Sequence, residues 1–179
     1  MTAVLQTERA FAELGLLEDV VLRRSQPLAS LPMEDPDLNS VFEYWKSCGH
    51  DGLLPRRKDI DVLQLKPVLG NTHLVDVTAQ DPADYRFRLY GSKVRLNRFR
   101  NYTNSRVGDL PSEPYRKTVI EDYSSVVWSG SPLYQNIVAR LQSIRYSYSR
   151  LLLPLAEDGR KVNMLIICTR DRTFSDLTV

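Results

Sequence analysis

The chain has 179 residues, of which 42% are hydrophobic and 26% charged, and its formal net charge is +2. These values are ordinary for a globular protein, and a chain of this length buries about 70% of the surface that it exposes when unfolded. The near-neutral charge excludes strong overall steering towards nucleic acid or membranes, and no stretch reaches transmembrane length. Cys48 and Cys168 do not form a C-x-x-C pattern, so we expect a reduced cytoplasmic protein.

We expect an N-terminal helix and linker over residues 1–36, one domain over 37–170 and a tail over 171–179. The helix is predicted from Thr7 to about Arg24, because apolar residues recur there at helical spacing. Its apolar face packs either on the domain's own sheet or on a second subunit, since both arrangements bury the same residues. The residues of this face, which we predict to contact a partner, are Phe11, Leu14, Leu17 and Val21.

A second helix is predicted to begin at Pro36, with Asp35 as its N-cap. Its apolar residues recur at i, i+3, i+4 and i+7, which places them on one stripe. These residues are Leu38, Val41, Phe42 and Trp45. Burying four such side chains contributes at most roughly 6–12 kcal/mol, so this helix is expected to dock on the rest of the domain.

The loop after this helix is dense in opposite charges and reads Pro55-Arg56-Arg57-Lys58-Asp59-Ile60-Asp61. It either folds on itself through ion pairs and carboxylates that cap backbone N–H groups, or forms a latch between helix and sheet or the rim of a ligand pocket. We favour a structural role, because no nucleophile lies beside a base in this loop. The residues assigned to the latch are Trp45, Pro55, Arg56, Asp59 and Asp61.

This region resembles the opening signature of a bacterial PAS-like sensor family. The similar residues are Tyr44-Trp45 followed by Gly52-Leu53-Leu54-Pro55-Arg56-x-x-Asp59-Ile60-Asp61. The similarity continues through Leu74–Val77, Tyr85–Gly91 and the C-terminal hairpin, and so covers about residues 37–170. The chain departs from the family at Asn104, where the family tends to place Gly after Thr, although Asn also adopts positive φ.

Two strands, two helices and three strands are predicted after the charged loop. They are Thr72–Val77, Tyr85–Tyr90, Ser92–Arg98, Glu113–Trp128, Pro132–Leu141, Tyr146–Ala156 and Lys161–Thr169. Gly159 lies where the last hairpin needs positive φ. Consecutive hairpins imply antiparallel pairing. The order is similar to the PAS arrangement, and we expect an α+β fold: an antiparallel sheet of about five strands with helices on one face, preceded by N-terminal helices.

The resemblance implies a small-molecule pocket between the sheet and the helices, with a signal passed through flanking helices. Apolar and aromatic residues that face this space either line such a pocket or fill a closed core, and both interpretations stay open. These candidate ligand-binding residues are Phe87, Leu89, Tyr115, Val119 and Tyr123.

Between Arg86 and Arg106 there are seven basic residues and no acidic one, with aromatic residues interleaved. This pattern is typical either of a site for a nucleotide-like ligand or nucleic acid, or of a solvated face balanced by acidic residues such as Asp76, Asp81 and Asp84. The near-neutral chain favours the solvated face. The residues of the possible anion patch are Arg86, Arg88, Arg95, Arg98 and Arg100.

The two histidines, His50 and His73, lack paired ligand spacing, so no metal site is predicted. Some PAS domains hold haem through a histidine, but for His73 we favour a surface or hydrogen-bonded role. No haem or flavin motif is present, which leaves any cofactor unknown, and no catalytic residue is assigned.

We therefore predict a non-enzymatic, single-domain PAS-like sensory or adaptor protein in signal transduction. It binds a small molecule, a partner protein or both, and acts as a homodimer or with a signalling partner. One alternative is a module that binds nucleic acid or nucleotides through residues 86–106. The other is a small enzyme with an acidic residue near residues 59–61.

Overall fold

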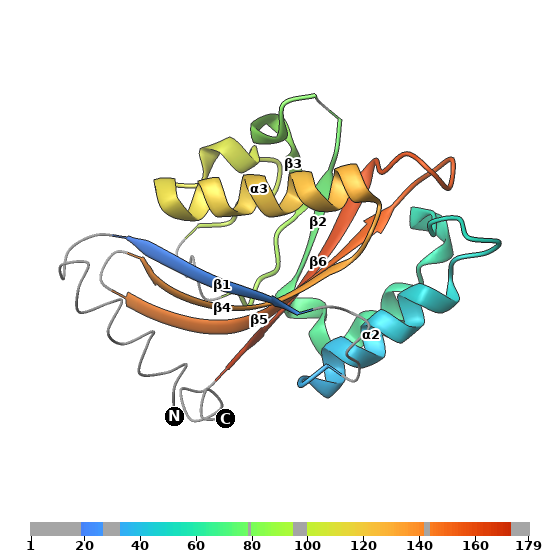
Figure 1. Ribbon diagram of the computed structural model, residues 1–179, viewed down its shortest axis with the longest axis horizontal. Helices are drawn as coiled ribbons and strands as arrows, with labels where there is room; N and C mark the ends of the chain where they lie inside the picture. The colour runs from blue at the N-terminus through green and yellow to red at the C-terminus, as the bar shows by residue number, and fades with distance from the viewer. Residues whose placement is uncertain (1–18, 27–32, 79, 95–99, 142–143, 173–179) are drawn as a thin grey trace.

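The computed structural model describes residues 19–26, 33–78, 80–94, 100–141 and 144–172. Within these residues the chain forms one six-stranded sheet with strand order β1-β4-β5-β6-β2-β3, in which every neighbouring pair is antiparallel (Figure 1). The strands are β1 (Val20–Gln26), β2 (Thr72–Asp76), β3 (Arg86–Leu89), β4 (Leu133–Leu141), β5 (Ile144–Leu155) and β6 (Met164–Asp171). The predicted α+β fold with an antiparallel sheet is thus confirmed, with one strand more than expected.

The central strands β5 and β6 are buried on both faces. Their sequences contain the apolar runs 151–155 and 164–168, in which every residue is buried. Continuous apolar runs are typical of strands that are covered on both sides, whereas a half-exposed strand alternates polar and apolar residues. The hairpin between them turns at Gly159, whose φ of +77° matches the prediction for this position.

Helix α3 (Glu113–Ser129) covers one face of the sheet. Pro114 lies in its first turn, and Gly130 ends it with a φ of +63°, the left-handed conformation that glycine adopts without steric cost. Its inward stripe includes Tyr115, Val119 and Tyr123, all buried in a core to which every strand of the sheet contributes.

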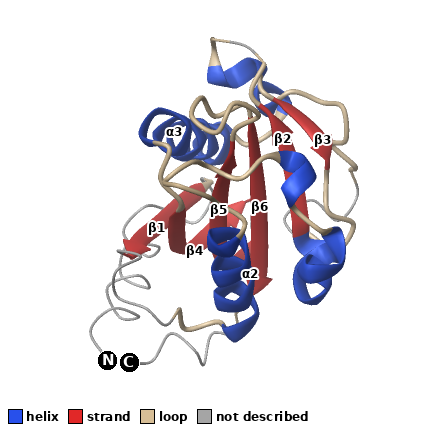
Figure 2. Cartoon of the chain, turned by 90° about the vertical axis from the view of Figure 1, so that its right-hand side faces the viewer, coloured by secondary structure: helices blue, strands red, loops and turns tan. Residues whose placement is uncertain are grey.

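Helix α2 (Pro36–Ser47) covers the opposite face together with the 3₁₀ helix η2 (Val62–Asn71), and it packs against β5 and β6 (Figure 2). Asp35 caps it as predicted, accepting a hydrogen bond from Leu38 N at 2.9 Å. The predicted stripe of Leu38, Val41, Phe42 and Trp45 is buried. The helices thus lie on both faces rather than on one, because β5 and β6 present apolar side chains to both sides.

The N-terminal helix predicted to reach Arg24 is wrong over its last residues, because these form strand β1. This strand pairs antiparallel with β4 along its whole length, from Val20 opposite Arg140 to Gln26 opposite Tyr134. The pairing satisfies backbone groups along one side of β4, a long-range gain that helical periodicity does not reveal. Val21 therefore packs on the domain's own core, whereas Phe11, Leu14 and Leu17 lie outside the described residues.

The assignment of Leu89 to the inner face is also wrong. The register between β2 and β3 shifts, with Val75 opposite Phe87 and Leu74 opposite Leu89, so that Arg88 is an extra residue. A bulge of this kind breaks the alternation of side chains along a strand. Phe87 is consequently buried and Leu89 is 41% exposed.

Short 3₁₀ segments connect the remaining elements. They are η1 (Arg57–Asp59), η3 (Pro82–Asp84) and η5 (Val107–Asp109). Of the helix predicted over Ser92–Arg98, Ser92 and Lys93 form a turn, and residues 95–99 lie outside the described part. No helix in the described ranges is both long enough and apolar enough to cross a membrane.

Candidate functional site

A cluster of buried polar side chains lies between α3 and the sheet. It joins Arg150 of β5, Asp122 of α3 and Gln135 of β4, which are 2%, 4% and 1% exposed. A charged side chain is rarely buried to this extent unless it is paired. These three residues form an unusual polar cluster in the described part of the core.

The three side chains form a closed triangle of hydrogen bonds. Arg150 Nη2 donates to Asp122 Oδ2 and, at 2.6 Å, to Gln135 Oε1. Gln135 Nε2 in turn donates to Asp122 Oδ1 at 3.1 Å. Each member therefore orients the other two, which is the geometry in which a buried network rigidifies a core.

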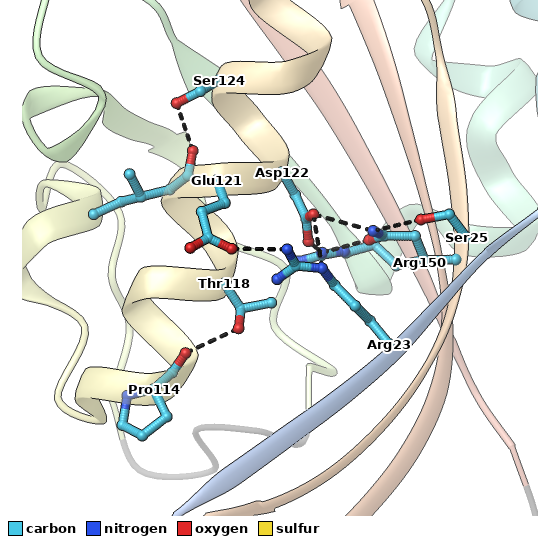
Figure 3. Close-up of polar contacts among 10 residues, drawn as sticks. Arg23, Ser25, Pro114, Thr118, Glu121, Asp122, Ser124 and Arg150 are labelled. Atoms are coloured by element: carbon cyan, nitrogen blue, oxygen red, sulfur yellow. Dashed lines mark hydrogen bonds and ion pairs between the residues drawn. The ribbon is translucent and has the colours of Figure 1, made fainter.

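The triangle is also attached to strand β1 (Figure 3). Arg23 Nε lies 3.3 Å from Asp122 Oδ1, and Arg23 Nη2 donates to Glu121 Oε2 at 2.7 Å. Ser25, two residues further along the same strand, accepts a hydrogen bond from Gln135 Nε2 at 3.3 Å. The N-terminal edge strand is thus connected through Asp122 and Gln135 to the guanidinium group of Arg150.

Three buried tyrosines lie within electrostatic reach of the guanidinium group: Tyr115 and Tyr123 of α3 and Tyr148 of β5. Burial raises the pKa of all three hydroxyls, so each remains a protonated donor at neutral pH. Arg150 Nε is buried and has no hydrogen-bond partner among the described residues. The site therefore combines a fixed cation, one open donor and several hydroxyl groups inside an otherwise apolar core.

Four of the residues predicted to bind a ligand lie in the same core as this cluster, whereas Asp122, Gln135 and Arg150 were not predicted. Phe87, Tyr115, Val119 and Tyr123 lie in one core cluster, and their role in ligand binding stays a prediction. Asp122 lies three residues after Val119 and so falls on the same inward stripe of the helix. A carboxylate within that apolar stripe was a signal of a buried partner.

The charged loop connects α2 with η2 and is hydrogen-bonded to the residue that follows β5. Trp45 Nε1 donates to Pro154 O at 3.0 Å, and Pro55 O accepts from Ala156 N at 3.0 Å. Arg56 donates to both oxygens of Asp59, at 2.9 and 3.0 Å, which lowers the pKa of this carboxyl group to about 2.

The last aspartate of this loop holds the following segment. Asp61 Oδ1 caps η2 by accepting from Leu63 N at 2.9 Å, and Asp61 N donates to Tyr44 Oη at 2.7 Å. These contacts join α2, the loop and η2. The assignment of the loop as a latch stays a prediction.

Acidic partners hold several of the basic residues between 86 and 106. Arg88 Nε pairs with Asp76 at 2.9 Å, and Arg106 pairs with Asp84 and Asp109 at 3.2 Å. The Arg100 guanidinium lies 5.0 Å from the centre of the Tyr102 ring. Arg95 and Arg98 lie outside the described residues, and the role of this region as an anion patch stays a prediction.

His73 is buried in the same core as the tyrosines. Its Nδ1 accepts a hydrogen bond from Gly91 N at 3.1 Å, and its ring centre lies 4.1 Å from that of Tyr90. Burial, together with the charge of Arg150, lowers its pKa to about 3. In the described part of the chain, no group of His, Cys, Asp or Glu side chains is arranged to hold a metal ion.

Known proteins show similarities to this chain in sequence and in structure. The sequence model of a family described as a PAS domain matches residues 33–167. A solved structure entitled "Structure of an RNA-binding Light-Oxygen-Voltage Receptor" is similar at 15% sequence identity and a TM-score of 0.44, covering 97% of this chain. The chain spans 44% of the length of that protein. No curated protein matches the sequence.

Proposed function

Because the chain belongs to the PAS domain family and is a sensory signal-transduction domain, we propose that its α3-face core binds a small molecule and passes the signal to a partner protein through strand β1. Binding, in this proposal, occurs between α3 and the sheet, in the domain predicted over residues 37–170. The protein acts in the cytoplasm, as a homodimer or with a signalling partner. Both cysteines are free, which suits a reducing compartment.

The observation that carries this proposal is the open donor of Arg150. Its Nε is buried without a partner among the described residues, beside Tyr115, Tyr123 and Tyr148. Small-molecule sites are mostly apolar and contain a few polar groups that converge on the ligand. A ligand with an acceptor oxygen would satisfy Arg150 Nε, and the tyrosine hydroxyls would supply further donors.

The contacts of Asp122 support a route for the signal. A ligand that attracts Arg150 competes with Asp122 for the guanidinium group, and Asp122 also holds Arg23 of β1 at 3.3 Å. A change in this carboxylate therefore alters how firmly β1 is held against α3. Since β1 is an edge strand, its release would expose unpaired backbone groups of β4 to another chain.

The test is to compare native and denaturing mass spectra of freshly purified protein. We expect a stoichiometric compound that denaturation releases. Val119→Phe should displace it by filling space on the α3 face, whereas Val41→Phe, equally buried on the α2 face, should retain it. Both variants are first checked for folding by circular dichroism. Loss of the compound from both folded variants, or from neither, would contradict binding on the α3 face.

Hydrogen exchange tests the second part of the proposal. Removal of the compound should change the protection of the amides of β1 and leave those of β6 unchanged. Uniform protection of β1 with and without the compound would exclude this strand as the route of the signal.

A further inference from the structure

A second region, made of other residues than the Arg150 cluster, exposes apolar surface at one end of the sheet. Trp128, in the last turn of α3, is 88% exposed, and Leu53, in the loop after α2, is 40% exposed. Tryptophan is a large side chain that is strongly buried on average, and it is enriched among residues that dominate binding at protein interfaces. An indole that is almost fully in water therefore suggests a contact with another molecule.

The loop that carries Leu53 follows α2 in the chain and lies between the end of α3 and the β5–β6 turn. Leu54 N donates to Gly159 O at 2.8 Å, which fixes the loop to the turn. A Cβ atom placed on Gly130, two residues after Trp128, would lie 3.9 Å from Leu54 Cδ1. The end of α3, the loop and the β5–β6 turn lie towards the same side of the molecule (Figure 1). We call Trp128, Leu53 and Leu54 the Trp128 surface.

A pocket of about 230 Å³ adjoins this surface and has an acidic lining. Leu53 and Leu54 contribute to its walls, and its carboxylates are those of Asp59, Glu157 and Asp158. Arg56 also lines it; this guanidinium is paired with Asp59 at 2.9 Å and also lies within electrostatic reach of Glu157. Glu157 and Asp158 therefore leave the lining with a net negative charge.

The end of helix α3 adds to the negative potential of this region. Its last turn has no basic residue, so its terminal carbonyl groups and the negative end of the helix dipole are not neutralised from within the helix. Arg160 and Lys161 belong to the β5–β6 turn and do not line the pocket. Their backbone N–H groups and the charge of Lys161 lower the pKa of Asp158, so Glu157 is the carboxylate left to face a ligand. The pocket and its surroundings thus favour a cation that has an apolar stem.

We propose that this end of the domain docks a segment of a partner protein that carries an arginine or lysine beside a bulky apolar residue. The cationic side chain enters the pocket, its methylene groups pack on Leu53 and Leu54, and its charged end faces Glu157. The neighbouring apolar side chain packs on the Trp128 ring. The proposal stands independently of ligand binding in the core, because it uses none of the same residues.

The probe for the test is the peptide acetyl-Leu-Arg-Phe-amide, with acetyl-Leu-citrulline-Phe-amide as its uncharged match. Binding to the full chain is followed by the two tryptophan indole signals in ¹H–¹⁵N spectra. Trp45 is an internal reference, since its Nε1 is buried and bonded to Pro154 O. We expect the arginine peptide to shift the Trp128 signal saturably at up to millimolar concentration, and the citrulline peptide to bind at least about tenfold more weakly.

Three variants distinguish specific docking on this surface from nonspecific binding of the peptides. Glu157→Gln should weaken the binding of the arginine peptide and leave the binding of the citrulline peptide unchanged. Trp128→Ala should weaken the binding of both peptides. Because this variant lacks the indole signal, its binding is followed by the amide signal of Leu53. Leu63→Ala is the control, because Leu63 is 74% exposed on η2 and does not line the pocket. It should bind both peptides like the unmodified chain.

Each opposite outcome overturns the proposal. Equal binding of the two peptides would show that the charge is not recognised, and the absence of a saturable shift would show that the surface is not a docking site. Binding of free arginine as tight as that of the peptide would make the pocket a small-molecule site. Concentration-dependent dimerisation in sedimentation that Trp128→Ala abolishes would identify a second copy of the chain as the occupant.

Discussion

The two faces of the sheet are both well buried but differ in their chemistry. The face under α2 is largely aliphatic, and its strand residues include Leu151, Leu153 and Ile166. The face under α3 buries Arg150 and Asp122 among several tyrosines. Adjacent residues of β5 thus belong to two different environments, since successive side chains along a strand point to opposite faces.

This difference separates two ways in which side chains contribute to a core. Aliphatic side chains gain stability from burial without any need for a specific partner. A buried ion pair gains little over an apolar core of the same shape, because both charges lose their hydration. The α2 face therefore needs no chemistry beyond burial, and the polar α3 face is the one whose chemistry supports the binding proposal.

The largest expected effect comes from Asp122→Ala. Removing this carboxylate leaves the buried Arg150 guanidinium with Gln135 Oε1, 2.6 Å away, as its remaining hydrogen-bond acceptor among the described residues. Breaking a buried pair in this way costs about 3–5 kcal/mol. Urea unfolding followed by tryptophan fluorescence measures the loss in the free energy of unfolding. A loss below about 1 kcal/mol would mean that the guanidinium is accommodated without Asp122.

The double variant Asp122→Leu with Arg150→Met is the control for this measurement. It replaces both charges by apolar groups, which is often neutral or stabilising for a buried pair. We expect it to recover most of the stability lost in Asp122→Ala and to lose any small molecule bound in the core. Recovery of stability together with retention of the compound would show that Asp122 and Arg150 are not needed for ligand binding.

The second prediction concerns pH and His73 on the α3 face. Burial and the charge of Arg150 lower the pKa of His73 from 6.5 to about 3, so the unfolded chain binds a proton before the folded chain does. The contribution of His73 to stability is complete above pH 6.5 and decreases as the pH falls towards 3, by at most roughly 1.4 kcal/mol per pH unit. Unfolding free energies measured across this range give the slope.

Two histidine variants isolate this slope. His73→Gln keeps an acceptor that Gly91 N can reach but removes the titrating group, so stability should depend less on pH. His50→Gln, at an exposed position, should retain the slope of the unmodified chain. Identical slopes for all three proteins would show that His73 does not titrate in this way.

The parts of the fold that depend on local sequence were predictable. Asp35 and Pro36 begin α2, the apolar stripe of that helix is buried, and Gly159 adopts the positive φ that its position requires. Each of these features depends on interactions within a few residues along the chain. Hydrophobic periodicity and turn chemistry therefore suffice to locate them.

The parts that failed depend on partners far away in the sequence. The run Val20-Val21-Leu22 suits a helix or a strand, and only pairing with β4 decides between them. The bulge at Arg88 turned Leu89 outwards, which alternation along a single strand does not reveal. Asp122 was identifiable as a charge on an apolar stripe, but its partner Arg150 is 28 residues away on another element.

The third prediction tests the α2 face through Trp45→Phe. This change removes the donor to Pro154 O, a hydrogen bond of 3.0 Å, and leaves a buried carbonyl group unpaired. We expect a loss of about 1–3 kcal/mol in urea unfolding followed by circular dichroism. Trp128→Phe makes the same substitution at a position that is 88% exposed, so it should leave stability unchanged. Equal losses in both variants would contradict the role of the hydrogen bond.

The smallest expected effect is at Asn104, in the loop that closes the α3 face beyond β3. Asn104 has a φ of +69°, and its N–H donates to Phe87 O at 2.6 Å, which helps to hold Phe87 in that core. Alanine in this left-handed conformation costs roughly 1–2 kcal/mol, whereas glycine adopts it freely. Thermal unfolding should therefore rank Asn104→Gly at or above the unmodified chain and Asn104→Ala below it. If Asn104→Gly were the less stable of the two variants, the contribution of this position to stability would come from the side chain rather than from the backbone conformation.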